Sequence, residues 1–435
     1  MSHRLKKITF VGGGSAYTPL IVDQFATNNR FDEIEEIVFV EPNSHKGLSI
    51  SSFCKALLEK HNKYPKIILS ETVNESIRNS DLIINIFRAG GLNGRHIDET
   101  IGNDLGILGQ ESQGFGGFSS VLRNLAVLKE IAPVIERNCH SALCINITNP
   151  SGILTYAARK MNLNAVGICD VPFAMKAKIA KTLNLEQNKL EMDYVGLNHL
   201  GWITELRYNE KSILDAQLNS PTINTLLKAI KQNNIPNVDM DYNFLKKIRA
   251  IPSSYLYYYY HEKELAKQLL KSSQSRAQRV MENNRKVYAK FDDLAIDDWP
   301  SFFGIGRGAY LLGDAVGEFI SSYYGNHDST HIICVPNNKC LTFLEREVVI
   351  EAPVTVKKGK LIPILNDYQP NTHLRSLISA VSRYEVMTAE AGLSGDIELA
   401  FQALASHPLI PTLEVAKELT NRVMKTFKEY LPQFS

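Results

Sequence analysis

Two side chains far apart in the chain, Cys169 and His199, are the residues whose types and surroundings point most directly to metal chemistry. Cys169 ends an apolar run and is followed by an acid and by Pro172, which suits the start of a helix. A thiolate and a neutral imidazole would bind a divalent cation and leave coordination positions open for substrate oxygens. We therefore predict one metal ion between them. Without further context, a buried apolar cysteine and a capping histidine would explain the same residues.

A nucleotide-binding pattern opens the chain and is the first of the elements that must position such a site. A buried strand is expected over residues 8–11, followed by the glycine-rich segment 12–19 (GGGSAYTP) and a helix to about residue 25. Glycines let the backbone approach a pyrophosphate, and a helix N-terminus offers unpaired N–H groups to the same anion. Thr18 suits the N-cap of this helix, because Pro19 suits its first position.

An acidic residue after the next strand indicates which dinucleotide is preferred. The strand is expected over residues 36–40, and Glu41 follows it directly. A carboxylate there accepts hydrogen bonds from the ribose hydroxyls of NAD and repels the additional phosphate of NADP. The sequence therefore predicts NAD binding, and the cofactor-binding candidates are Gly12, Gly14, Ser15 and Glu41.

Strands and helices then alternate, which predicts a doubly wound parallel sheet. Further strands are expected over residues 66–69, 81–86, 142–146 and 165–168, and helices over residues 46–60, 121–136 and 152–161. Ligands of such sheets bind beyond the carboxyl ends of the strands. Arg88, Asn149 and Cys169 follow strand ends, so they lie where chemistry is expected.

Beyond about residue 198 the alternation weakens, which indicates a second lobe of different architecture. Five tyrosines stand within residues 251–260, and an aromatic core stripe or an oligomer surface would explain most of them. One tyrosine near a metal could act as a base, since a nearby cation favours the phenolate. Residues 265–290 are expected to be helical. The glycine-rich segment 106–117 is expected to be a loop, either a mobile connection or part of a site.

Length and composition set bounds on the class of protein. With 435 residues, the chain is expected to form two domains, over residues 1–195 and 196–435. Its 48 Lys and Arg residues nearly balance 46 Asp and Glu residues, which argues against nucleic-acid or membrane-surface partners. No apolar run is long enough to span a bilayer, and no signal-peptide core follows Met1. The six cysteines lack a disulfide framework spacing, so reduced thiols and a cytoplasmic location are expected.

Six short motifs together resemble glycoside hydrolase family 4, the NAD- and divalent-metal-dependent glycosidases, and they follow the family's order. They are the segments 12–19 (GGGSAYTP), 87–91 (FRAGG), 109–111 (GQE), 146–150 (NITNP), 169–172 (CDVP) and 196–199 (GLNH). The resemblance implies an α/β fold, with an N-terminal Rossmann-like domain and a C-terminal α+β lobe like that of lactate and malate dehydrogenases. It also implies NAD, Mn²⁺ and a homodimer or homotetramer. The ligand types alone would not exclude Zn²⁺, Co²⁺ or Ni²⁺.

The same resemblance implies a reaction course that differs from two-carboxylate glycoside hydrolysis. Bound NAD takes a hydride from C3 of the sugar, a base removes the acidified C2 proton, and the C1–O bond breaks by elimination. Water then adds and the hydride returns, so NAD is not consumed. The metal acts as a Lewis acid at the C2 and C3 oxygens.

Matching the family motifs gives roles to individual residues. Cys169 and His199 are the implied metal ligands, and Tyr255 is the implied C2 base, with Tyr258 as the alternative. Asp170 is either the acid for the departing glycosidic oxygen or the N-cap of the following helix. The implied substrate-binding residues are Arg88 and Arg276 for a phosphate, Asn149 for a sugar hydroxyl, and Glu111.

The anomer of the substrate is left open by features that disagree. The segments 307–310 (RGAY), 403–411 and 430–434 look most like those of 6-phospho-β-glucosidases, which act on phosphorylated cellobiose-type disaccharides. Asp170 is more typical of 6-phospho-α-glucosidases, since β-branch members usually carry Asn after the metal cysteine, and Gly201-Trp202 points the same way. A 6-phospho-galactosidase, or a member that acts on unphosphorylated glycosides or uronides, is also open. Outside the family, the alternatives are an NAD-dependent 2-hydroxy-acid dehydrogenase and a non-catalytic nucleotide-binding regulator.

Overall fold

The N-terminal half forms a parallel sheet. The computed structural model describes residues 4–233, 235–236, 238–272, 274–303, 309–325, 327–365 and 368–435, so Arg307 and Gly308 of the segment 307–310 lie outside the described residues. The strands of this half are β1 (Lys7–Val11), β2 (Glu36–Val40), β3 (Lys66–Ser70), β4 (Leu82–Asn85), β5 (Leu143–Asn146) and β6 (Ala165–Gly167). They pair in the order β3-β2-β1-β4-β5-β6, all in parallel. This is the strand order of the doubly wound dinucleotide-binding fold, so that prediction is confirmed.

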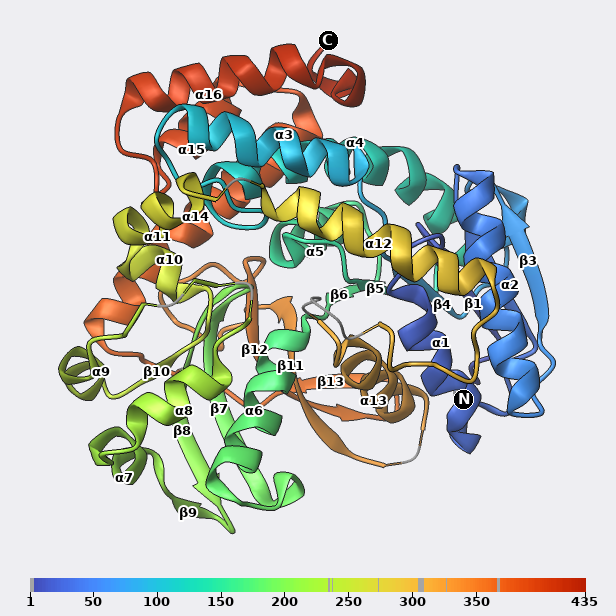
Figure 1. The fold of residues 1–435 in the computed structure, drawn as a ribbon, viewed down its shortest axis with the longest axis horizontal. Coiled ribbons are helices and arrows are strands. Elements are labelled where there is room, and N and C mark those ends of the chain that lie inside the picture. Colours follow the sequence, from blue (N-terminus) through green and yellow to red (C-terminus); the bar gives the residue numbers. More distant parts are fainter. Residues whose placement is uncertain are drawn as a thin grey trace.

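Helices connect these strands and cover the sheet (Figure 1). They are α1 (Thr18–Thr27), α2 (Ser44–Lys60), α3 (Gly91–Asp104), α4 (Gly114–Cys139), α5 (Ser151–Lys160) and α6 (Asp170–Leu183). Two helix starts differ from the prediction. The N-cap of α1 is Tyr17, because Thr18 is already helical and buried. α4 begins at Gly114 instead of residue 121, since Gly116 packs against a loop: a Cβ there would lie 1.8 Å from the carbonyl oxygen of Gln110.

The second half adds antiparallel strands to the same sheet. They are β7 (Leu190–Leu197), β8 (Leu200–Tyr208), β9 (Lys211–Ser212), β10 (Ile251–Pro252), β11 (Ser329–Pro336), β12 (Val349–Lys357) and β13 (Lys360–Pro363). From β6 the order continues through β11, β12, β7 and β8 to β10, while β13 pairs with β12 and β9 with β8. Over the described residues the result is one sheet of 13 strands. β7 runs across residue 195, and the domain boundary placed there stays a prediction.

The helices of the second half lie partly beside its strands and partly on the helices of the first half (Figure 1). They are α7 (Leu214–Asn219), α8 (Ile223–Ile230), α9 (Tyr242–Ile248), α10 (Leu256–Tyr260), α11 (Glu262–Leu270), α12 (Arg276–Asp292), α13 (Leu312–Tyr324), α14 (Thr372–Ser394), α15 (Ile397–Ala405) and α16 (Leu413–Thr426). The single helix predicted over residues 265–290 is thus two helices, because Ser275 forms a capping box with Gln278 and starts α12 anew. Among the described residues, no helix is both long and apolar enough to cross a membrane.

The sheet separates two hydrophobic cores, as expected when successive side chains of a strand point to opposite faces. Phe10, Phe39 and Ile84 belong to one buried cluster, which α1, α2 and α13 complete. Val38 and Ile83 belong to the other, which includes residues of α4, α5 and α14. α12 packs against both α3 and α2, and in Figure 1 it crosses the molecule between them. The helix therefore links the start of the chain to the region that holds the candidate site.

Candidate active site

The side chains of Cys169 and His199 meet just beyond the carboxyl end of β6. Sγ of Cys169 lies 3.4 Å from Nε2 of His199, and both side chains are buried. Two ligands of one tetrahedral ion lie about 3.5 Å apart, if its bonds are about 2.3 Å to sulfur and about 2.0 Å to nitrogen. The observed separation therefore fits a divalent ion. Two protein ligands by themselves would leave coordination positions for substrate oxygens or water. Among the described residues no group of three or more His, Cys, Asp or Glu could hold a metal.

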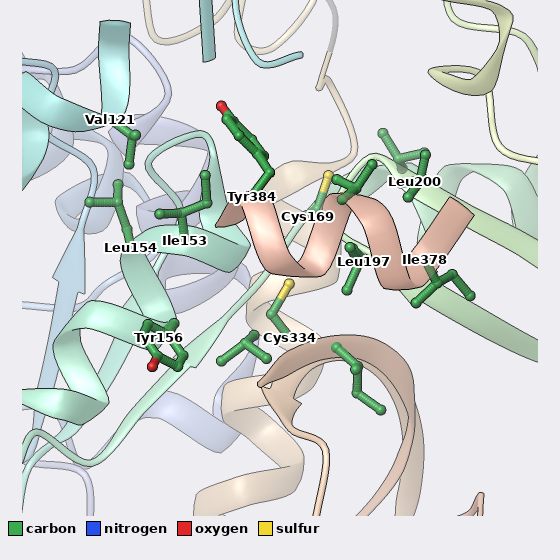
Figure 2. Close-up of a cluster of buried hydrophobic side chains, with 14 of the residues drawn as sticks. Val121, Ile153, Leu154, Tyr156, Cys169, Leu197, Leu200, Cys334, Ile378 and Tyr384 are labelled. Carbon is green, nitrogen blue, oxygen red and sulfur yellow. The ribbon is translucent and has the colours of Figure 1, made fainter. Parts of the chain in front are cut away.

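The sheet brings these two residues together. Cys169 is the N-cap of α6, directly before its first residue, Asp170. His199 stands in the tight turn between β7 and β8, with a positive φ of 66°. β6 pairs with β11, β11 with β12, and β12 with β7, and this series carries the turn to Cys169. The sulfur lies in the same buried cluster as Leu197 and Leu200, which flank the turn (Figure 2).

Tyr255 stacks on the imidazole of His199. The ring centroids are 3.7 Å apart, and the ring planes differ by 4°. Burial raises the pKa of the Tyr255 hydroxyl well above its usual value, and the negative charges of Cys169 and Glu111 raise it further. The phenolate therefore needs a cation nearby. The ring centroid of Tyr258 lies 6.2 Å from that of Tyr255, and Tyr255 is the tyrosine that stacks on the histidine.

Asp170 lies beside the same residues. Burial raises its pKa to about 6, although Lys178 acts in the opposite direction. Its charge in turn raises the pKa of both Cys169 and Tyr255. Asp170 is the first residue of α6 and Cys169 is its N-cap, so the alternative that Asp170 caps this helix is wrong. An acid in the first turn still favours the helix dipole.

Glu111 joins two arginines next to this group. One carboxylate oxygen pairs with Arg88, and Oε2 lies 2.6 Å from Nη1 of Arg95. Burial by itself would raise the pKa of Glu111, but Arg88 and Arg95 lower it to about 2. Arg95 also pairs with Glu99 at 2.7 Å, within α3. Arg88 keeps 33% of its side chain exposed, so it remains accessible to an anion.

The start of α12 adds a further cation. The backbone N–H of Ala277 donates to Oε2 of Glu99 at 2.9 Å, which anchors this helix end on α3. Burial lowers the pKa of the neighbouring Arg276, and the charges of Arg95 and Arg279 lower it further. Positive charges are therefore gathered around Glu111. Guanidinium groups at a helix N-terminus form an arrangement that attracts phosphate.

The glycine-rich turn after β1 fits a dinucleotide. Gly12 has a φ of +84°, and a Cβ there would lie 2.4 Å from Cα of Phe87. A Cβ on Gly14 would lie 2.6 Å from Cγ of Glu41, and the Gly14 N–H donates to Oε2 of Glu41 at 3.2 Å. Side chains at these positions would fill the cradle that a pyrophosphate needs. Ser15 completes the turn, and its hydroxyl accepts the N–H of Tyr17 at 3.3 Å.

This turn adjoins the charged group. Phe87, which packs on Gly12, directly precedes Arg88. The hydroxyl of Tyr288 in α12 donates to the carbonyl oxygen of Gly14 at 2.5 Å, so α12 contacts both regions. Asn149 follows Thr148, whose hydroxyl donates to the carbonyl oxygen of Phe87 at 2.8 Å. The residues that were predicted to bind the nucleotide, the metal and the phosphate thus lie near the carboxyl ends of the parallel strands.

Two residues of the site, Arg95 and Ser112, are not indicated by the sequence patterns. Arg95 stands four residues before Glu99, a spacing that also suits an ordinary pair on a helix surface. The hydroxyl of Ser112 lies 2.9 Å from Nδ1 of His199. Its only signal in the sequence was its place in the segment 106–117.

Family models match most of the chain. The model described as family 4 glycosyl hydrolase matches residues 7–185, and that of the family 4 glycosyl hydrolase C-terminal domain matches residues 194–410. The chain belongs to glycosyl hydrolase family 4, as its motifs predicted. This membership favours the glycosidase over the dehydrogenase and the regulator that the sequence left open.

Two curated relatives match over nearly their full lengths. A probable 6-phospho-beta-glucosidase of Bacillus subtilis is 31% identical over 437 residues, which cover 98% of each chain. The phospho-alpha-glucosidase PagL of Clostridium acetobutylicum is 26% identical, over 97% of this chain and 98% of that one. The relatives therefore include both anomeric classes.

Solved structures agree with the family and with the predicted fold. The 6-phospho-beta glucosidase from Thermotoga maritima, solved with manganese, NAD⁺ and glucose-6-phosphate, has a TM-score of 0.88 at 29% identity, over 98% of this chain and 99% of that one. Lactate dehydrogenase from Eimeria maxima has a TM-score of 0.54 at 14% identity, over 90% of this chain and 95% of that one. The second likeness concerns the fold alone, and it agrees with the predicted dehydrogenase-like architecture.

Proposed function

We propose that the protein hydrolyses 6-phospho-β-glucosides, such as phosphorylated cellobiose-type disaccharides, with NAD and Mn²⁺ or another divalent metal as cofactors. The observation that carries the proposal is the 3.4 Å approach of Cys169 to His199, with Tyr255 stacked on the imidazole. Membership in family 4 and the similarity to the proteins of Bacillus subtilis and Thermotoga maritima support it.

When bound, NAD supplies a reversible hydride acceptor, and the divalent ion supplies a Lewis acid for negative charge on the sugar oxygens. Cys169 and His199 would hold the ion. The residues that would hold NAD are Gly12, Gly14, Ser15 and Glu41. The glycines keep this turn free of side chains, and burial of Cys169 and His199 would limit the access of water to an ion that they hold.

In this proposal the protein moves two protons. Tyr255 removes the proton at C2 of the sugar, and its stacking on His199 keeps the hydroxyl next to the metal ligands. Asp170, with its pKa raised to about 6, retains a proton in mildly acidic solution and donates it to the departing glycosidic oxygen.

The charged group would bind the phosphate of the substrate. Arg88 and Arg276 supply charge-assisted hydrogen bonds to its oxygens. Glu111 neutralises Arg88 while no phosphate is present and keeps Arg95 in place afterwards. Asn149 would bond a sugar hydroxyl.

Paired substrates test the anomer and the class of reaction together. We expect 4-nitrophenyl 6-phospho-β-glucoside to be cleaved at least about ten-fold faster than its α-anomer, in assays with NAD and Mn²⁺, a discrimination worth about 1.4 kcal/mol. Omitting NAD or adding a chelator should abolish cleavage, and no net NADH should form. The unphosphorylated β-glucoside is the control for the phosphate site. Faster cleavage of the α-anomer would instead support 6-phospho-α-glucosidase, the alternative that Asp170 favours.

The preference for NAD tests the role of Glu41. We expect NAD to bind at least about ten-fold more tightly than NADP, because the carboxylate would repel the additional phosphate. Glu41→Gln should narrow this ratio mainly by improving NADP binding. Both affinities can be measured by calorimetric titration without metal or substrate. Equal affinities in the unmodified protein would remove Glu41 from the cofactor site.

Two further expectations concern the cellular location of the enzyme and its oligomeric state. The six cysteines are all unpaired and buried, which supports a cytoplasmic location. A homodimer or homotetramer is expected from the family resemblance, and sedimentation velocity at micromolar concentration would measure it.

A further inference from the structure

Ser112 contacts the candidate metal ligand on the side opposite to the thiol. Its Oγ lies 2.9 Å from Nδ1 of His199, while Nε2 of the same ring faces Sγ of Cys169. Ser112 is 6% exposed and His199 is 2% exposed, so water does not compete freely for either group. The imidazole is therefore held between a hydroxyl and a sulfur.

This contact decides which ring nitrogen can bind a cation. A metal at Nε2 requires the lone pair of that nitrogen, so the ring proton must be on Nδ1. Nδ1–H then donates, and the hydroxyl of Ser112 accepts.

Contacts of the backbone around Ser112 hold its hydroxyl next to Nδ1 of His199. Oε1 of Gln110 accepts the N–H groups of Ser112 and Gln113, both at 2.7 Å. The first turn of α4 packs directly behind it, because a Cβ on Gly117 would lie 2.8 Å from the carbonyl carbon of Ser112. The serine is thus fixed by hydrogen bonds on one side and by a close backbone contact on the other.

We propose that Ser112 is a positioning residue that fixes the Nδ1–H tautomer and the ring orientation of His199, and so raises the affinity of the site for a divalent cation. This inference rests on the proposed metal site. Outer partners of ligating histidines contribute about 10- to 100-fold to metal affinity in other proteins. Ser112 touches neither the sugar nor the dinucleotide in this proposal, so its effect should appear in metal binding.

The test is a calorimetric titration of Mn²⁺ into the metal-free protein. Ser112→Ala is expected to weaken Mn²⁺ binding about 10- to 100-fold. Ser112→Thr keeps the hydroxyl, so its Mn²⁺ affinity should stay close to that of the unmodified protein. Ser112→Val has the shape of the threonine variant without the hydroxyl, so it should bind Mn²⁺ as weakly as Ser112→Ala. The affinity for NAD, measured without metal, should not change in any of the three, which also shows that each variant is folded.

Ser51 provides the matched control. It is a buried serine in α2, 5% exposed, whose hydroxyl donates to the carbonyl oxygen of Leu48. Ser51→Ala should leave Mn²⁺ affinity unchanged. Equal affinities of Ser112→Thr and Ser112→Val, or an unchanged affinity of Ser112→Ala, would overturn the positioning role while the metal site itself stands. Absence of Mn²⁺ binding by the unmodified protein would overturn both this inference and the proposed function.

Discussion

Replacing Cys169 with serine is expected to weaken Mn²⁺ binding by more than about 100-fold, beyond the loss typical of an outer partner, and to abolish hydrolysis. A hydroxyl at this position is shorter than the thiol and does not ionise near neutral pH, so it cannot replace the thiolate. Burial raises the pKa of the Cys169 thiol well above its usual value, and nearby carboxylates raise it further. Metal binding must therefore release the thiol proton, and the affinity of the unmodified protein should rise with pH. Calorimetric titrations at two pH values measure both effects.

Cys54→Ser is the matched control for this substitution. Cys54 is also buried, but it belongs to α2 and lies in the other hydrophobic core. Both variants lose a buried sulfur, so both should unfold at a lower temperature than the unmodified protein. Mn²⁺ affinity should fall only in Cys169→Ser. Retention of stoichiometric metal by Cys169→Ser would contradict the metal site and, with it, the proposed reaction.

Replacing Tyr255 with phenylalanine is expected to lower kcat about 10²- to 10⁴-fold, the range that a positioned general base contributes. Phenylalanine keeps the ring that stacks on His199 at 3.7 Å, so Mn²⁺ and NAD affinities should stay unchanged. The lost step is removal of the C2 proton. In D₂O the unmodified enzyme should place deuterium at C2 of the product sugar phosphate, and the residual activity of Tyr255→Phe should show this exchange only at its reduced rate. Mass spectrometry of the product measures the incorporation.

Tyr258→Phe separates the two candidate bases. The Tyr258 ring lies 6.2 Å from that of Tyr255, and its surroundings include Arg95 and Arg276. We expect Tyr258→Phe to retain C2 exchange and to lose less than about ten-fold in kcat, below the range for a general base. If C2 exchange slowed in Tyr258→Phe but kept the rate of the unmodified enzyme in Tyr255→Phe, the roles of the two tyrosines would be reversed. If both variants kept that rate, neither tyrosine would be the base.

Much of the first half of the fold was predictable because its signals are local. The strand before Gly12, the turn and the acid at Glu41 follow one another within a single βαβ unit, and each element shows its own periodicity. The doubly wound parallel sheet and the family were both predicted from such local patterns, and both are confirmed. The errors also have local causes: the segment 106–117 is predicted to be a loop because of its glycines, but Gly116 allows close packing inside α4.

The second half was less predictable because its strands are defined by partners far away in the chain. β7 contains Glu191 and Asp193 on its partly exposed positions, and its pairing with β12 depends on residues near Glu351. No local pattern shows that such a strand extends the N-terminal sheet. The prediction of a single helix over residues 265–290 was wrong because Ser275 caps a new helix within this range.

By itself, the sequence determined the chemical types at the site: a thiol, an imidazole, a tyrosine cluster, and cationic and glycine-rich segments in a recognisable order. Only the tertiary structure decided that Cys169 and His199 are in contact. It also decided that Tyr255 is the tyrosine that stacks on the imidazole and that Ser112 contacts Nδ1 of the same ring. The physical reason is one of distance along the chain. Side-chain types and strand periods are properties of neighbouring residues, whereas these contacts depend on how β6, β11, β12 and β7 align across the sheet.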